Sequence, residues 1–343
     1  MNVLLVKMSS LGDIVHALPA VDDAAGRGVR FDWVVEENYE PLPALAAAVD
    51  AVLPVAFRRW RRGPLTGAGE ALAFRRRVRQ RRYDLVLDAQ GLVKSAVVAS
   101  IARADERVGF DFGSVRERPA ALAYSRRVPV ARGEHAITRN RELFAAALGY
   151  KAPATPPRFG LAGRPVHDSQ VLLAHGTTWS TKTWPEPYWI DLARRVADAG
   201  LTPVVPWIDG EKPRALRIAQ AVPQAHVCPP MDLAGVLELV GTARGVIGVD
   251  SGIAHLGAAF GRPTVMLFGP TDSRLTGCQG RYASNLSASL GCAPCQSRRC
   301  HYGGAARTWQ GKPVEPACLA SVRPTRAWSA LRRLMALERA DAR

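Results

Sequence analysis

Long apolar runs are missing from this sequence. No stretch approaches the roughly 18 consecutive apolar residues that a membrane-spanning helix requires, and the N-terminus has no basic start before its short apolar stretch. We therefore expect neither a membrane span nor a secretion signal. Cysteine is also scarce, with 6 in 343 residues. In a chain without an export signal this scarcity favours reduced thiols or a metal over a disulfide framework. These absences predict a cytoplasmic protein.

Acidic residues are the other deficit. Aspartate and glutamate number 30 against 46 lysines and arginines, which gives a formal net charge of +16 at pH 7. Such an excess favours an anionic partner, such as the phosphate groups of a nucleotide, a nucleic acid or a lipid. Hydrophobic residues make up 48% of the chain and charged residues 22%, which is ordinary globular usage and argues against disorder. The length suits two domains of about 150 residues each.

Short apolar runs alternate with helical patterns in both halves of the chain, and together they predict an α/β protein with parallel sheets. In the first half we expect strands at 3–6, 31–35 and 84–88, a helical pattern that ends near residue 25, and a helix at 93–102. Prolines crowd residues 153–168 and predict a linker. In the second half we expect strands at 171–174, 201–206, 245–249 and 265–268, and a helix at 187–199. Ligands of such sheets bind at the carboxyl ends of the strands.

The first candidate site follows the first strand. Ser10, Gly12 and Asp13 lie where an α/β sheet presents residues to its ligand. Gly12 allows the backbone to approach a ligand closely. Asp13 has two interpretations, because an acid at a helix start stabilises the positive end of the helix dipole and can equally serve as a catalytic carboxylate. Spacing alone leaves both open, although acids that cap helices are common.

A second candidate site opens a helix in the second half. Ser251 and Gly252 stand at a helix start, where exposed N–H groups suit a diphosphate. Asp250 would repel an anion, so we expect it to accept hydrogen bonds from sugar hydroxyls or to orient the loop. His255 lies one turn into the helix and is either a structural histidine or a donor to a phosphoryl oxygen.

A third loop follows the strand at 171–174. Thr177, Thr178 and Lys182 provide two hydroxyls and an ammonium, which suit a phosphate or a leaving group. The alternative is a surface loop with a solvated lysine. Glu211 and Met231 also follow strands of this half, where a nucleoside could lie.

The most one-sided charge lies between Arg58 and Arg82. This stretch contains ten arginines, no lysine and a single acid, Glu70. We expect Arg58, Arg59, Arg61 and Arg62 to flank Trp60 in a loop, and Arg75, Arg76, Arg77 and Arg79 to lie on a helix. A run of charge is usually a solvated surface, but an arginine cluster with an aromatic inside it also suits nucleic acid, an anionic membrane or an acidic acceptor.

Four cysteines near the C-terminus form the last pattern. They are Cys292, Cys295, Cys300 and Cys318. A CxxC pair followed by two more cysteines can hold a structural metal through thiolates. The second pair is not a CxxC, so reduced structural thiols are the alternative.

Four motifs, in order along the chain, resemble the ADP-heptose:lipopolysaccharide heptosyltransferases. They are Lys7-Met8-Ser9-Ser10-Leu11-Gly12-Asp13, the run from Asp88 to Ala96, the loop from His175 to Thr178 with Lys182 to Pro185, and the run from Asp250 to His255. The resemblance extends from residue 3 to about residue 275. It implies the GT-B glycosyltransferase architecture, in which two Rossmann-like domains face each other across a cleft. The domains it implies are an acceptor-binding domain at 1–152, the linker at 153–168, an ADP-heptose-binding domain at 169–322 and a C-terminal helix at 323–343.

The resemblance also implies a reaction. It is the inverting transfer of L-glycero-D-manno-heptose from ADP-heptose to the 3-deoxy-D-manno-octulosonate (Kdo) of Kdo-lipid A in the lipopolysaccharide inner core, with no cofactor and no metal in the chemistry. The implied partners are ADP-heptose, Kdo-lipid A and the anionic inner face of the cytoplasmic membrane, where the enzyme would be peripheral, with no nucleic acid.

Two alternatives remain. One is addition of the second heptose, which the Cys292–Cys318 region favours, whereas the Gln90-Gly91-Leu92 run favours the first. The other is a nucleic-acid-binding protein that uses the arginine stretch, although no helix-turn-helix or RNA-recognition motif accompanies it.

Carried onto this sequence, the resemblance makes Asp13 the general base and places Lys182 at the leaving ADP. Together with the positions noted above, the expected donor-binding residues are Thr177, Thr178, Lys182, Glu211, Met231, Asp250, Ser251, Gly252 and His255. The expected acceptor-binding residues are Ser10, Gly12, Arg58, Arg59, Arg61, Arg62 and Arg116.

Overall fold

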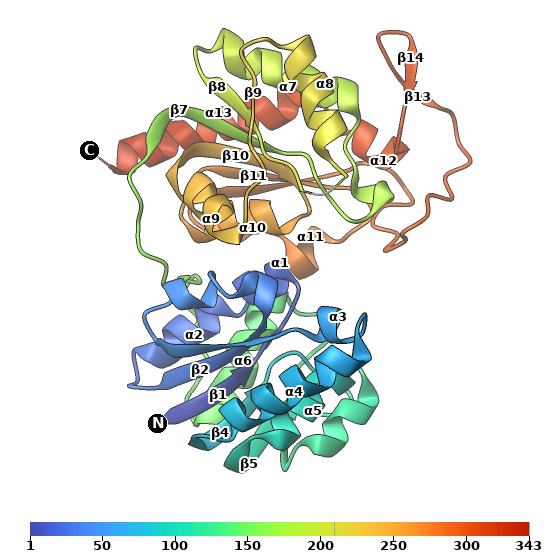
Figure 1. Cartoon of the computed structure of the whole chain (residues 1–343). Coiled ribbons are helices and arrows are strands. Elements are labelled where there is room, and N and C mark those ends of the chain that lie inside the picture. The colour runs from blue at the N-terminus through green and yellow to red at the C-terminus, as the bar shows by residue number, and fades with distance from the viewer. Residues whose placement is uncertain (209, 343) are drawn as a thin grey trace. The chain divides into compact units, whose positions relative to one another are not determined.

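The computed structural model describes residues 1–208 and 210–342, with the side chains of residues 64–66 outside the description. The chain divides into two compact units, Met1–Ala162 and Gly163–Arg343. Each unit is an α/β layer structure with its own parallel sheet (Figure 1). Among the described residues, no helix combines the length and the apolar character needed to cross a membrane.

The first unit is built on a six-stranded sheet in the order β3-β2-β1-β4-β5-β6. The strands are β1 (Asn2–Val6), β2 (Arg30–Glu36), β3 (Val49–Val55), β4 (Arg82–Asp88), β5 (Arg103–Phe110) and β6 (Arg126–Val128). All neighbouring strands pair in parallel. Val3 to Val6 are fully buried, which is why this central strand is a continuous apolar run in the sequence.

Helices cover both faces of this sheet (Figure 1). They are α1 (Leu11–Val15), α2 (Leu18–Ala25), α3 (Phe57–Trp60), α4 (Pro64–Val78), α5 (Val93–Ile101) and α6 (Ala136–Leu148), with short 3-10 helices at η1 (Glu37–Tyr39), η2 (Pro43–Leu45) and η3 (Arg118–Ala123). Phe74 and Val78 of α4 and Val98 of α5 pack with Leu4 and Val6 in one core cluster. Helices α2 and α6 pack against each other.

The second unit repeats this plan, because its sheet has the order β12-β11-β10-β7-β8-β9. The strands are β7 (His167–Ala174), β8 (Thr202–Val205), β9 (His226–Val227), β10 (Ala243–Val249), β11 (Thr264–Phe268) and β12 (Ala283–Ser287), followed by the antiparallel hairpin β13 (Arg307–Trp309) and β14 (Lys312–Val314). Counted from the first strand of each unit, the two orders are identical. Both are the order of a dinucleotide-binding sheet.

Helices of the second unit also lie on both faces of its sheet. They are η4 (Ser180–Lys182), α7 (Glu186–Asp198), α8 (Lys212–Ala221), α9 (Leu233–Thr242), α10 (Gly252–Ala259), α11 (Ser273–Thr276), α12 (Ala317–Ala320) and α13 (Pro324–Asp341). Trp189 of α7, Ile218 of α8 and Leu331 of α13 share one core with strand residues Leu173 and Ile247. Ala254 and Ala258 of α10 pack with Met266 and Phe268 of β11 in another core cluster.

The expected strands are all present, but the sequence pattern missed seven of the described strands. These are β3, β5, β6, β9, β12 and the hairpin strands β13 and β14. Three further expectations were wrong in detail. The helical pattern that ends near residue 25 is two helices, with Pro19 in the first turn of α2. The arginine segment expected as a loop contains the short helix α3, and strand β7 begins at His167, inside the expected linker.

Candidate active site

Each sheet reverses its strand order at one point, and several of the candidate residues follow the strands at that point. The reversal lies between β1 and β4 in the first unit and between β7 and β10 in the second. The loops after these four strands carry Asp13, Gln90, Lys182 and Ser251. Ligands of open α/β sheets bind at such reversal points, because neighbouring connections leave toward opposite faces and open a crevice between them.

Asp13 lies in the first turn of α1 and takes part in capping this helix. Ser10 is the N-cap residue of α1, and its backbone N–H and hydroxyl both donate to Oδ2 of Asp13, at 2.8 and 3.0 Å. Within the described residues, the other carboxylate oxygen accepts no hydrogen bond. The capping and catalytic interpretations are therefore compatible, because capping occupies one oxygen and orients the other.

Two motif residues that were not expected to have site roles hold this loop. Gln90 accepts at its side-chain oxygen from the backbone N–H groups of Met8 and Ser9, at 3.0 and 3.2 Å. Lys7 is buried and donates to the carbonyl of Ala89 at 2.8 Å. Burial lowers the pKa of Lys7, and the charge of Asp13 opposes that shift. A lysine at the end of an apolar strand was the signal that could have identified this residue.

Further arginines lie near Lys7. Arg116 is exposed, and it and Arg139 both act to lower the pKa of Lys7. Arg139 donates to the carbonyl of Ser114 at 2.8 Å, and Arg132 donates to that of Val115 at 2.7 Å. Sequence reasoning singled out Arg116 but missed Arg132 and Arg139. The carboxyl end of this sheet therefore has a strongly positive surface.

The four arginines around Trp60 have different environments. Arg59 forms ion pairs with Glu37, at 3.0 Å, and with Glu70, which also accepts from Nε1 of Trp60 at 2.7 Å. By contrast, the side chains of Arg58, Arg61 and Arg62 form no ion pair with any described residue. The structure thus ties Arg59 to the protein and leaves the other three available to an anionic partner.

In the second unit, Lys182 and Asp250 form the central contact of the candidate site. Nζ of Lys182 lies 2.6 Å from Oδ2 of Asp250, which also accepts from the hydroxyl of Thr271 at 2.7 Å. Nε2 of His255 lies 3.7 Å from Oδ1. Burial opposes ionisation of Asp250, but the hydrogen bond from His255 and the charge of Lys182 outweigh it and lower the pKa of this carboxyl. Asp250 therefore orients both its own loop and the side chain of Lys182. The sequence analysis did not identify Thr271 as a residue of this site.

The start of α10 presents an unused hydroxyl. Ser251 is the N-cap residue of this helix, and its side chain does not cap it. Its Oγ is buried and has no hydrogen-bond partner among the described residues. Gly252 begins the helix, so the first backbone N–H groups lie beside this hydroxyl. Together they can bind a phosphoryl oxygen.

Glu211 lies against the loop that follows β7. A side chain at Gly176 would place Cβ only 2.0 Å from Oε2 of Glu211, so only glycine allows this approach. Glu211 accepts from the N–H of Ile208 at 3.0 Å, and the N–H of Thr177 also donates to it. Burial raises the pKa of Glu211 against these hydrogen bonds. The structure thereby brings Thr177 and Glu211 together.

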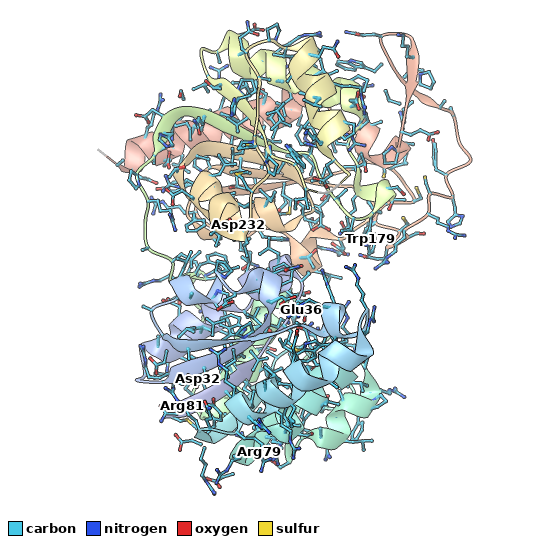
Figure 2. All side chains as sticks on the ribbon, in the orientation of Figure 1. Asp32, Glu36, Arg79, Arg81, Trp179 and Asp232 are labelled. Atoms are coloured by element: carbon cyan, nitrogen blue, oxygen red, sulfur yellow. The ribbon has the colours of Figure 1, made fainter. Side chains whose placement is uncertain are left out.

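Thr178 and Met231, the other two residues of the third candidate group, have fewer defining contacts. Thr178 is exposed in the loop before η4. Met231 is half-buried and directly precedes Asp232, the N-cap residue of α9, whose carboxylate accepts from the N–H of Gly235 at 2.9 Å (Figure 2).

The four C-terminal cysteines are all free thiols. Cys292, Cys295 and Cys300 are exposed and Cys318 is buried. Burial raises the pKa of Cys318 to about 11, and the three other thiols add to this effect. Across residues 1–208 and 210–342, no three His, Cys, Asp or Glu side chains are arranged to hold a metal ion.

Two units with Rossmann strand order, together with the similarity to solved heptosyltransferase structures, place the chain in the GT-B class of glycosyltransferases. Within that class, the chain belongs to Glycosyltransferase family 9 (heptosyltransferase), whose family model matches residues 71–306. The expected fold class and family are therefore confirmed.

Characterised relatives cover most of the chain. Lipopolysaccharide heptosyltransferase 1 of Pseudomonas aeruginosa is 41% identical over 348 aligned residues, which cover 98% of each chain. Among solved structures, the Escherichia coli heptosyltransferase WaaC with ADP is 40% identical, with a TM-score of 0.79, over 83% of this chain and 92% of that one. The same enzyme with ADP-2-deoxy-2-fluoro heptose has a TM-score of 0.77 at 39% identity, over 84% of this chain and 94% of that one.

Proposed function

We propose that this protein transfers L-glycero-D-manno-heptose from ADP-heptose to the Kdo of Kdo-lipid A, during synthesis of the lipopolysaccharide inner core. The observation that carries the proposal is the placement of Asp13 and of the Lys182–Asp250 pair at the two reversal points of a family 9 chain. The identity to a lipopolysaccharide heptosyltransferase 1 over nearly the whole chain supports it. The donor analogue bound by the Escherichia coli relative supports the donor.

Asp13 is the proposed general base. The acceptor hydroxyl attacks the anomeric carbon of the heptose from the face opposite the diphosphate, so the configuration inverts. As the new C–O bond forms, the hydroxyl becomes acidic and its proton passes to the uncapped oxygen of Asp13. The capping bonds from Ser10 hold the carboxylate in one orientation during this step.

Lys182 and the start of α10 are the proposed stabilisers of the leaving group. The bond between the anomeric carbon and the diphosphate oxygen breaks, and ADP departs with the electron pair. Lys182 has three N–H donors and uses one on Asp250, so the others can bind the diphosphate. The unpartnered Ser251 hydroxyl and the first N–H groups of α10 can stabilise the developing charge without rearrangement.

The two units divide the substrates in this proposal. The 1–152 region binds the acceptor through Ser10, Gly12 and the arginines, and the 169–322 region binds ADP-heptose through the residues of its four loops. The available side chains of Arg58, Arg61 and Arg62 face the phosphorylated acceptor and the anionic inner face of the cytoplasmic membrane. The protein is thereby cytoplasmic and peripheral to that membrane.

The decisive experiment is ADP release by the purified enzyme with ADP-heptose and one of two acceptors. We expect release with Kdo-lipid A and none with the same acceptor already carrying one heptose. Release only with the heptosylated acceptor would make this the enzyme that adds the second heptose. If neither acceptor gave ADP release while a control enzyme was active on the same substrates, the proposal would be overturned.

The Asp13→Asn variant tests the mechanism. We expect turnover to fall about 100-fold to 10⁴-fold, the usual contribution of a general base, with unchanged affinity for ADP. The matched control is Asp22→Asn, which removes a carboxylate from the next helix and leaves turnover near the wild-type rate. Turnover of Asp13→Asn within a few-fold of wild type would remove Asp13 from the chemistry.

A further inference from the structure

The segment after β12 is fastened to two loops of the donor site. The carbonyl of Ser297 accepts from the hydroxyl of Thr181 at 2.9 Å, which ties the segment to the loop after β7. The N–H of Gln296 donates to the carbonyl of Pro270 at 2.7 Å, next to Thr271. Thr271 in turn donates to Asp250. Segment 291–300 is therefore tied to the residue before Lys182 and to the residue before Thr271, which donates to Asp250.

This segment places a second cation on the ring that Lys182 already contacts. Trp179 is half-buried at the edge of the second unit, where Figure 2 labels it. Nζ of Lys182 lies 4.5 Å from the ring centroid, and the guanidinium carbon of Arg298 lies 4.8 Å from it. Both distances are within the range of a cation–π contact. The ring of Trp179 thus contacts two cations that come from different loops.

The charge balance of the site leaves a role for the second cation. Lys182 is paired with Asp250, so the two together add little net positive charge. A donor diphosphate brings a negative charge on each phosphate. Arg298 forms no ion pair with any residue in the described part of the chain, so its charge is uncompensated. Its fork of N–H groups suits phosphate oxygens.

We propose that Arg298 is a donor-binding residue, which contacts the diphosphate of ADP-heptose and stabilises the charge on ADP as it departs. The inference rests on the proposed function and extends its donor site to segment 291–300. Trp179 is the positioning residue, because its ring contacts both the guanidinium of Arg298 and the ammonium of Lys182. An acceptor role is less favoured, since the hydrogen bonds with Thr181 and Pro270 join the segment to donor loops.

Calorimetric binding of ADP and of adenosine tests this assignment. We expect Arg298→Ala to weaken ADP binding about tenfold, as the loss of a charged hydrogen bond predicts, and to leave adenosine binding unchanged. The ADP affinity of Arg298→Lys should lie between those of the wild type and Arg298→Ala, because a lysine keeps the positive charge but lacks the forked N–H groups of arginine. The matched control is Arg299→Ala, which removes the neighbouring exposed arginine and should bind ADP as the wild type does.

Two results would overturn the assignment. One is equal ADP affinity in Arg298→Ala and Arg299→Ala. The other is a loss that affects adenosine as strongly as ADP, which would show that the segment acts only by supporting the fold. A Thr181→Val variant adds a further check, since it frees the segment and should weaken ADP binding only while Arg298 is present. Because binding needs no acceptor, these outcomes stand even if the wild-type protein releases no ADP with either acceptor.

Discussion

Single residues of this site work through charges that the fold removes from water. Asp250 remains ionised because Lys182 and His255 surround it, and Lys7 lies buried beneath the loop of Asp13. His175 is the extreme case, since its side chain is fully buried and its ring lies edge-on to that of Trp189, at 6.4 Å between centroids. Of these residues, His175 is the one whose shifted pKa makes stability depend on pH between neutrality and mild acid.

His175 should give an acid-sensitive component of stability. Burial, with a smaller effect from Arg214, lowers its pKa from 6.5 to about 4. The unfolded chain therefore binds the proton first, so the contribution is complete above about pH 6.5 and is lost as the pH falls from there toward 4. The free energy of unfolding should drop by about 2 kcal/mol between pH 7.5 and pH 5 through this residue alone.

Urea unfolding of the wild type and of His175→Gln at these two pH values checks the sign and the size. The variant should lose this part of the pH dependence, whatever its stability at pH 7.5. The exposed His226 is the control, and His226→Gln should keep the wild-type dependence. An unchanged dependence in His175→Gln would show that the pKa of this ring is the same in the folded and the unfolded chain.

At the scale of elements, the turn after β4 fixes the position of the loop after β1. Asp88 is buried and accepts from the N–H groups of Gln90 and Gly91, at 2.8 and 3.0 Å. Gly91 has a φ of +67°, which a residue with a side chain rarely adopts. The turn directs the Gln90 side chain at the N–H groups of Met8 and Ser9, and so holds the loop that leads into the helix of Asp13.

The hydroxyl of Tyr124 completes this turn by donating to Asp88 at 2.8 Å. Tyr124→Phe leaves a buried carboxylate with one donor fewer, so we expect a loss of about 1–3 kcal/mol in the free energy of unfolding. Tyr150→Phe is the matched control in the same unit, because the buried Tyr150 hydroxyl has no partner among the described residues. Chemical denaturation compares the two, and equal losses would show that the Tyr124 bond does not support the turn.

At the scale of the whole molecule, the excess of positive charge should determine where the protein resides. The formal net charge is +16, and the arginine stretch of the first unit concentrates part of it in one segment. Surface cations attract anionic headgroups by about 1 kcal/mol each, and salt screens that attraction within a Debye length. The positive charge thus favours binding to an anionic membrane surface, where the proposed lipid acceptor would also lie.

Vesicle sedimentation tests this expectation. We expect binding to phosphatidylglycerol vesicles, weakening as salt rises, and little binding to phosphatidylcholine. The triple variant Arg58→Ala, Arg61→Ala and Arg62→Ala should lose on the order of tenfold to a hundredfold in vesicle affinity and keep its affinity for ADP. The charge-matched control replaces the exposed arginines Arg326, Arg332 and Arg333 of α13. An equal loss in that control would mean that total charge, and not this segment, contacts the lipid.

The sequence by itself determined the fold class and the local motifs. Central parallel strands are buried on both faces, so β1 and the second halves of β7 and β10 appear as continuous apolar runs, and the segments after them carry the motif residues. Asp13 and Ser251 could be identified as helix-start residues for the same reason. The missed strands lie toward the sheet edges or are only a few residues long, and β5 carries charged residues that break any apolar pattern.

Only the tertiary structure decided which of these residues meet. Lys182 pairs with Asp250 because the strand order places the loops after β7 and β10 at one reversal point. Trp179 contacts Arg298 because the segment after the edge strand β12 is tied to the loop after β7. Arg59 is held by Glu37 and Glu70, whereas its neighbours in the sequence are not. A local pattern reports how a residue fits its own helix or strand. It carries no record of the long-range contacts that set its charge, its burial and its partners.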